Sequence, residues 1–148
     1  MAAYRPLALM AADADDLKAI SVMLQDAIVK IGDMTYLQDE RRFVFMANRY
    51  CWEAGRGFLH PGYRVRTGIH FDDVQKVRAK SVRLDAKEAL IDVLSIEWEG
   101  DENGGCIKLS LAGGGTIALE TEAINVTVKD VSEPWRASRR PDHDGQWA

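Results

Sequence analysis

The sequence lacks the features by which membrane, secreted and disulfide-bonded proteins are recognised. Nowhere do apolar residues run for the ~20 positions that a membrane-spanning helix needs. The apolar stretch near the N-terminus is short and turns acidic at Asp13, unlike a signal peptide. The two cysteines, Cys51 and Cys106, form neither a disulfide framework nor a metal-binding spacing. These absences predict a cytoplasmic protein that makes no contact with a membrane.

Recognisable catalytic chemistry is missing as well. The chain has three histidines, His60, His70 and His143, and the sequence assigns none of them a nucleophile, a base or a metal as partner. His70 and Asp72 share one face of an expected strand, a spacing found in metal sites, but no third ligand accompanies them. The sequence therefore predicts no cofactor, no metal and no catalytic residue. A small enzyme with an unrecognised site stays an alternative.

What the sequence does contain is a run of alternating strands in the segment LIDVLSIEWEGDENGGCIKLSLAGGGTIALE, residues 90–120. Three strand-like stretches are separated here by two glycine-rich turns. Apolar residues recur at every second position, the pattern of a half-buried strand. The segment predicts a three-stranded antiparallel meander.

The two turns predict the register of this meander. We expect a two-residue loop at Asn103-Gly104 and a three-residue loop at residues 113–115, because these loops place the apolar side chains on one face. A slip by one residue would move a whole apolar set into water. The expected neighbours are Trp98 with Leu109, Leu111 with Ile117, and Lys108 between Glu99 and Glu120 on the outer face.

Upstream of the meander the pattern predicts one helix and a first set of strands. Asp13 is the expected N-cap of an amphipathic helix from Ala14 to about Gln25. The stretch RRFVFMANRYCWE is apolar on both faces, which predicts a central strand covered on both sides. Residues 74–82 read as a basic edge strand. The other expected strands lie at residues 7–10, 27–36, 63–71 and 124–128.

These elements predict an α+β fold that is mainly antiparallel β. Residues 27–80 and 90–131 each read as strand, turn, strand, loop and a longer third strand. The repetition predicts two three-stranded meanders that form a small barrel or sandwich, covered by one N-terminal helix. A single globular domain is expected over residues 1–131, followed by a flexible C-terminal tail at residues 132–148.

Charge is distributed unevenly, although the whole chain carries only −4. Residues 41–87 hold eleven Lys and Arg against four Asp and Glu, a net charge of +7, whereas residues 88–133 hold two against ten, a net charge of −8. This contrast predicts an electrostatic contact with a protein partner or with a second copy of the chain. Two alternatives stay open: nucleic-acid binding by the basic segment, which the acidic total disfavours, and neutralisation of the two segments within one molecule.

The longest loop signal is EAGRGFLHPG at residues 53–62, and loops of this kind carry function more often than strands do. Basic residues and one histidine are expected around it. Strand alternation places Arg64 and Arg66 on an outward face, where they need no internal partner. The candidate binding residues are Arg49, Arg56, Arg64, Arg66 and His70.

Five stretches of the chain together resemble a known family: LQDAIVKIGDMTYL, RRFVFMANRYCWE, GIHFDDVQKV, GGGTIALE and PWRASRRPDH. The chain is similar to an uncharacterised single-domain bacterial family, a domain of unknown function, from about Leu7 to His143. The resemblance implies a stand-alone cytoplasmic bacterial protein, and it supplies no activity, cofactor or catalytic residue. The expected function is therefore a non-catalytic interaction or regulatory module that associates with a protein partner or with itself as a homo-oligomer.

Overall fold

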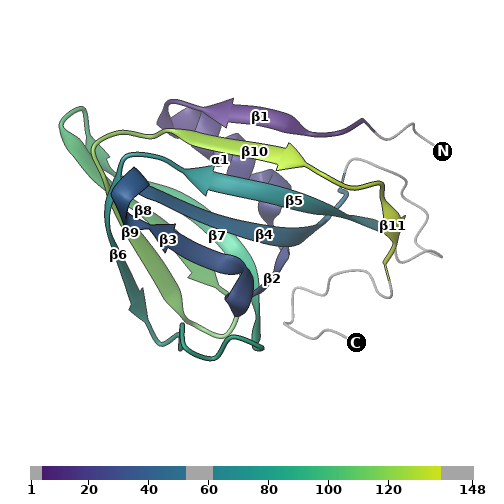
Figure 1. Cartoon of the computed structure of the whole chain (residues 1–148). Helices are drawn as coiled ribbons and strands as arrows, with labels where there is room; N and C mark the ends of the chain where they lie inside the picture. The colour runs from purple at the N-terminus through teal and green to yellow at the C-terminus, as the bar shows by residue number, and fades with distance from the viewer. Residues whose placement is uncertain (1–4, 53–61, 138–148) are drawn as a thin grey trace.

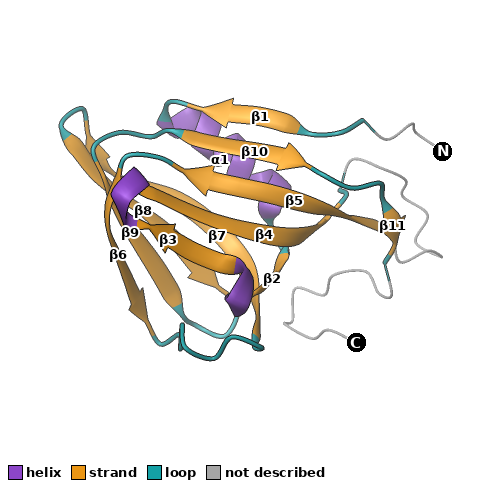
Figure 2. Ribbon diagram, viewed as in Figure 1, coloured by secondary structure: helices purple, strands orange, loops and turns teal. Residues whose placement is uncertain are grey.

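The structure of the protein is a computed structural model that describes residues 5–52 and 62–137, and strands dominate this part of the chain (Figures 1 and 2). The elements up to residue 80 are β1 (Ala8–Ala11), α1 (Ala14–Leu24), β2 (Ile28–Lys30), the 3-10 helix η1 (Ile31–Asp33), β3 (Met34–Leu37), the 3-10 helix η2 (Gln38–Glu40), β4 (Arg42–Tyr50), β5 (Tyr63–Phe71) and β6 (Val74–Lys80). The later elements are β7 (Leu90–Asp101), β8 (Gly104–Leu111), β9 (Thr116–Thr121), β10 (Val126–Asp130) and β11 (Trp135–Arg136).

The strands form one continuous antiparallel sheet in the order β1-β10-β5-β4-β2-β7-β8-β9-β6, with β3 added to β4 and β11 to β5. The predicted class, mainly antiparallel β with one α-helix, is confirmed, and β6 lies at an edge as its lysines indicated. Of the two predicted arrangements, a small barrel or a sandwich, the barrel is not formed, because the two ends of the sheet do not pair. A hollow of about 320 Å³, lined by Tyr36, Val77 and Leu84 among others, lies between β3 and β6.

The two halves of the chain exchange strands instead of packing as two separate meanders. β3-β4-β5 and β7-β8-β9 pair in sequence order, but β6 leaves the first set to pair with β9, and β10 leaves the second to pair with β5. The short β2 pairs with both β4 and β7 and so joins the two sets. Figure 1 shows the resulting curl, with β3, β4, β5 and β10 in front of β7 and β8 and with β6 at the left-hand edge.

The core lies between the inner side of the curled sheet and α1. Phe43, Phe45 and Phe71 meet there with ring centroids 6.1 to 6.3 Å apart. α1 begins where predicted, because the Asp13 carboxylate accepts a hydrogen bond from Asp16 N at 2.8 Å. In the described part of the chain no helix has the length and apolar character to cross a membrane. The buried side chains of α1 are Leu17, Ile20 and Leu24.

Both hairpins between β7 and β9 turn one residue earlier than predicted, which shifts every cross-strand partner by two. In the first loop, Glu102-Asn103, the Asp101 carboxylate accepts a hydrogen bond from Asn103 N at 2.8 Å. The second loop spans residues 112–114 and is closed by a bond from Leu111 N to Gly115 O at 2.9 Å. A shift of two residues keeps each side chain on the same face of the sheet. The predicted apolar face is therefore confirmed, whereas the predicted cross-strand pairs are wrong. The observed pairs are Trp98 with Ile107, Ile96 with Leu109, and Leu109 with Ile117.

The same shift changes the neighbours of Cys106 on the outer face of β8. Cys106, and not Lys108, lies opposite both Glu99 and Glu120. Burial raises the pKa of the Cys106 thiol, and the two carboxylates raise this pKa further. The thiolate form is therefore disfavoured at this position.

β4 is central in the sheet but is covered on one side only. Phe43 and Phe45 are buried on its inner face, whereas Val44 and Met46 on the opposite face are half-buried. The prediction of a strand covered twice is wrong, because α1 packs against the inner side of the curl.

The structure describes residues 132–137, the first part of the predicted C-terminal tail. Residues 135–136 form β11 and pair with β5. Arg66 N donates to Ser132 Oγ at 2.9 Å and Ala137 N donates to Gly62 O at 2.9 Å, so both sides of β11 are fastened. A strand of two residues is too short to show an alternating apolar pattern in the sequence. Residues 138–148 lie outside the described part of the chain.

A buried ion pair joins β4, β5 and β10 from the inner side of the sheet. Arg49 contacts both carboxylate oxygens of Asp130, Nε to Oδ1 at 3.0 Å and Nη2 to Oδ2 at 2.9 Å, and neither side chain is exposed. Thr67 Oγ1 donates to Oδ1 at 2.8 Å and Leu7 N donates to Oδ2 at 2.7 Å. Each oxygen thus accepts at least two hydrogen bonds, the condition under which a buried carboxylate is tolerated.

Arg49→Met would leave Asp130 buried without its bidentate partner. We expect the free energy of unfolding to fall by about 3–5 kcal/mol, the cost of breaking a buried pair from one side. Denaturant unfolding followed by circular dichroism measures this loss. The double variant Arg49→Met with Asp130→Leu removes both charges and should recover a large part of it. A double variant as unstable as the single one would contradict this explanation.

Candidate functional site

The five residues predicted to bind a partner do not form one surface. Arg49 belongs to the buried ion pair on the inner side of the sheet, where no partner can reach it. Arg56 lies outside the described residues, as does all but the last residue of the loop at 53–62. The other three candidates lie on β5.

Arg64 is a buried structural residue and not an outward cation. Its Nη1 donates to the backbone oxygens of Asp26 at 3.3 Å and Asn48 at 2.8 Å, and its guanidinium lies 5.6 Å from the centroid of the Tyr50 ring. Burial lowers the pKa of Arg64, while the carboxylates of Asp92 and Asp26 oppose that shift. The expectation that this arginine needs no internal partner is wrong, because the turn at Asp26 between α1 and β2 packs over this end of β5.

Arg66 and His70 do lie on the outer face, and each has an acidic partner. Arg66 Nη2 lies 3.0 Å from Asp33 Oδ2. His70 Nδ1 lies 3.2 Å from Asp72 Oδ2 without the alignment of a hydrogen bond. The other Asp72 oxygen accepts a hydrogen bond from Arg42 Nε at 2.6 Å. Within residues 5–52 and 62–137, no three potential metal ligands come together.

The basic and acidic segments of the chain meet inside the molecule. Because β6 pairs with β9 and β10 pairs with β5, residues of opposite charge become neighbours. On the outer face of β6 and β9, Lys76 also lies directly opposite Glu120. Ion pairs that link the two segments include Arg49 with Asp130, Arg41 with Glu122 at 3.3 Å, and Arg78 with Glu120 at 3.5 Å.

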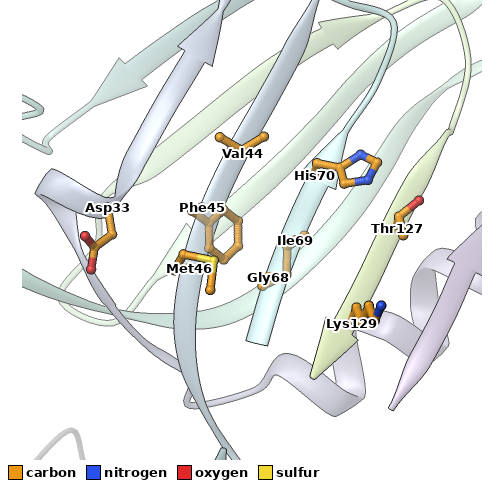
Figure 3. A pocket seen from close by; sticks show the side chains of 9 residues that line it. All are labelled: Asp33, Val44, Phe45, Met46, Gly68, Ile69, His70, Thr127 and Lys129. Atoms are coloured by element: carbon orange, nitrogen blue, oxygen red, sulfur yellow. The ribbon is translucent and has the colours of Figure 1, made fainter. Parts of the chain in front are cut away.

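The outer face of β4, β5 and β10 carries a shallow groove of about 290 Å³ (Figure 3). Its centre is Gly68 on β5, which lies directly between Met46 on β4 and Lys129 on β10 in the register of the sheet. Val44 and Met46 supply the apolar surface of the groove. The strands that form the groove are far apart in sequence. The next row of the groove consists of Val44, His70 and Thr127, and Asp33 lies at one side.

Gly68 creates the hollow, although its backbone does not require a glycine. Its φ lies outside the left-handed region. A Cβ at this position would lie 3.4 Å from Met46 Sδ, which is ordinary van der Waals contact. Glycine inside a strand weakens the strand. The residue therefore costs stability without a conformational reason, which is typical of positions that serve a function.

Lys129 is the charged residue of the groove that stays unpaired. Asp33 is paired with Arg66, and His70 lies beside Asp72. Lys129 is exposed and forms no ion pair with any residue that the structure describes. The groove therefore combines an apolar floor with a free positive charge at its edge.

These features define a class of protein: a small, mainly antiparallel α+β fold whose curled sheet carries a groove on its solvent side. The chain belongs to the family described as "Protein of unknown function (DUF2948)", whose model matches residues 7–143. The match confirms the resemblance seen in the sequence. No curated protein and no solved structure matches the chain.

Among the groove residues, the sequence prediction contained only His70. Gly68 carries a readable signal, because a glycine in the interior of a strand pattern often marks a close approach or a missing side chain. Lys129 carries none, because an outward lysine on a strand is ordinary and its position beside Gly68 depends on the pairing of β10 with β5.

We expect Gly68→Val to keep the fold and to raise the free energy of unfolding by about 0.5–1 kcal/mol, since a β-branched residue suits a strand better than glycine. Thermal unfolding should show the melting temperature rising by about 1–4 °C. A fall in stability of more than about 1 kcal/mol would show that the fold itself needs this glycine.

Proposed function

We propose that this protein is a non-catalytic binding module whose ligand site is the groove over Gly68. The observation that carries the proposal is the glycine itself, which opens a hollow on a solvent-facing sheet at a cost in stability that the fold does not require. A side chain at this position would fill the site.

The composition of the groove supports a binding role. Small-molecule sites combine apolar lining with a few polar groups that fix orientation. Val44 and Met46 provide the lining here, and Thr127, His70 and Lys129 provide the polar groups. At about 290 Å³, the groove lies just below the ~300–1,000 Å³ range of such sites. Its ligand, or the part of the ligand that enters, is therefore small.

Two other hollows support a binding role less well, because the fold accounts for both. The hollow between β3 and β6 lies where the sheet fails to close, and Tyr36 in its wall already donates a hydrogen bond to Val74 O at 2.7 Å. The second, of about 220 Å³, lies where residues 81–91 pass the turn between β8 and β9.

The basic segment gives little support to nucleic-acid binding or to self-association through charge. Arg49 and Arg64 are buried, and other arginines of residues 41–87 lie in ion pairs. A phosphate-tracking surface needs exposed cations in a continuous stripe. In the described part of this segment, the exposed cations outside ion pairs are Lys76, Lys80 and Lys87.

The proposal is tested by titrating the ¹⁵N-labelled full-length protein with 4-phenylbutanamide, a small apolar probe that ends in a neutral amide. The backbone amide resonances of Met46, Gly68 and Thr127 should shift in a saturable manner. In Gly68→Val the affinity should fall at least about tenfold, which corresponds to about 1.4 kcal/mol, because the added side chain occupies the hollow.

Thr116→Val is the matched control, since it places the same side chain on the outer face of β9, away from the groove. It should bind the probe like the wild type. An absence of saturable shifts at the groove, or equal losses in the two variants, would contradict the proposed site.

A further inference from the structure

Lys129 has a defined place beside the groove. It lies directly opposite Gly68 in the pairing of β10 with β5, and its backbone oxygen lies 4.0 Å from the position of a Cβ on Gly68. Figure 3 shows Lys129 and Thr127 along β10, beside the strand that carries Gly68. A lysine can lay its aliphatic stem on apolar surface while its ammonium group stays in water. The positive charge therefore stands at the mouth of an apolar hollow.

The acidic side chains around this hollow are already bound by other cations. Asp33 lies 3.0 Å from Arg66, and Asp72 lies 2.6 Å from Arg42. Asp130, the neighbour of Lys129 in sequence, belongs to the buried pair on the opposite face of the sheet. The charge that a ligand in the groove meets without displacing an existing partner is thus the ammonium of Lys129.

This arrangement discriminates between ligand chemistries. A cation would have to compete with an arginine for Asp33 or Asp72. A neutral ligand would use the apolar floor but would leave the charge of Lys129 without a counter-charge. An anion joined to a short apolar body would use both the floor over Gly68 and the free charge at its edge.

We propose that the groove selects a small amphipathic carboxylate, with its apolar body over Gly68 and its carboxylate at Lys129. The proposal rests on the function proposed above and specifies its ligand class. The groove volume of about 290 Å³ suits a free small molecule of this kind.

Isothermal titration calorimetry of the full-length protein with three probes tests the inference. 4-Phenylbutanoate, 4-phenylbutanamide and 4-phenylbutan-1-amine share one apolar body and differ in the charge of the end group. At ~0.1 M salt the carboxylate should bind about fivefold more tightly than the amide, the upper range for an exposed ion pair, and the amine should bind more weakly than both. At ~1 M salt the preference should shrink, because screening shortens the reach of the charge.

Lys129→Gln should remove the preference for the carboxylate over the amide, and Lys129→Arg should retain it. Lys80→Gln is the control: it removes the same charge from the exposed edge strand β6 and should leave the preference unchanged. Equal binding of carboxylate and amide by the wild type would overturn the inference, as would a preference that survives in Lys129→Gln. In both cases the proposed function would still hold if the amide binds in the groove of the wild type and this binding is lost in Gly68→Val. Failure of all three probes to bind would remove both proposals.

Discussion

The contact between Arg49 and Asp130 is the constraint on which the arrangement of β4, β5 and β10 depends. A charge pair withdrawn from water is tolerated only when its hydrogen bonds are complete. Here the donors come from β4, from β5 through Thr67 and from the backbone before β1 through Leu7. A slip of any of these strands by two residues would keep every apolar side chain on its face, yet it would separate these groups by about 7 Å. The ion pair thus distinguishes registers that the apolar pattern treats as equal.

The ion pair and the groove lie on opposite faces of the same three strands. Thr67 precedes Gly68 in sequence, and Lys129 precedes Asp130, so strand alternation sends one residue of each pair inward and the other outward. Holding the inner residues in place therefore positions the outer ones. A site built from strands distant in sequence needs such support from behind, because its shape is lost when one strand moves relative to the next.

The sequence predicted what depends on neighbouring residues and missed what depends on pairing. The helix after Asp13 and the inward and outward faces of β7 to β9 follow from local period and capping. The hairpin partners were shifted by two, since a period of two cannot distinguish such registers. No short turn connects β4, β5 and β10 with one another. The sequence therefore could not predict that Gly68 and Lys129 are neighbours. One signal was readable: Arg49 is in phase with the buried Phe43 and Phe45, and Asp130 with the buried Val126 and Val128, so two opposite charges occupy buried positions.

Native-state hydrogen exchange tests most directly whether the groove strands are held by the pair behind them. In the wild type, the amides of Met46, Gly68 and Val128 should exchange only through global unfolding, with the opening free energy that denaturant unfolding gives. In Arg49→Met these three amides should instead open together, at a free energy below that of β8. If in Arg49→Met these three amides still opened only through global unfolding, the ion pair would not be what holds the groove in shape.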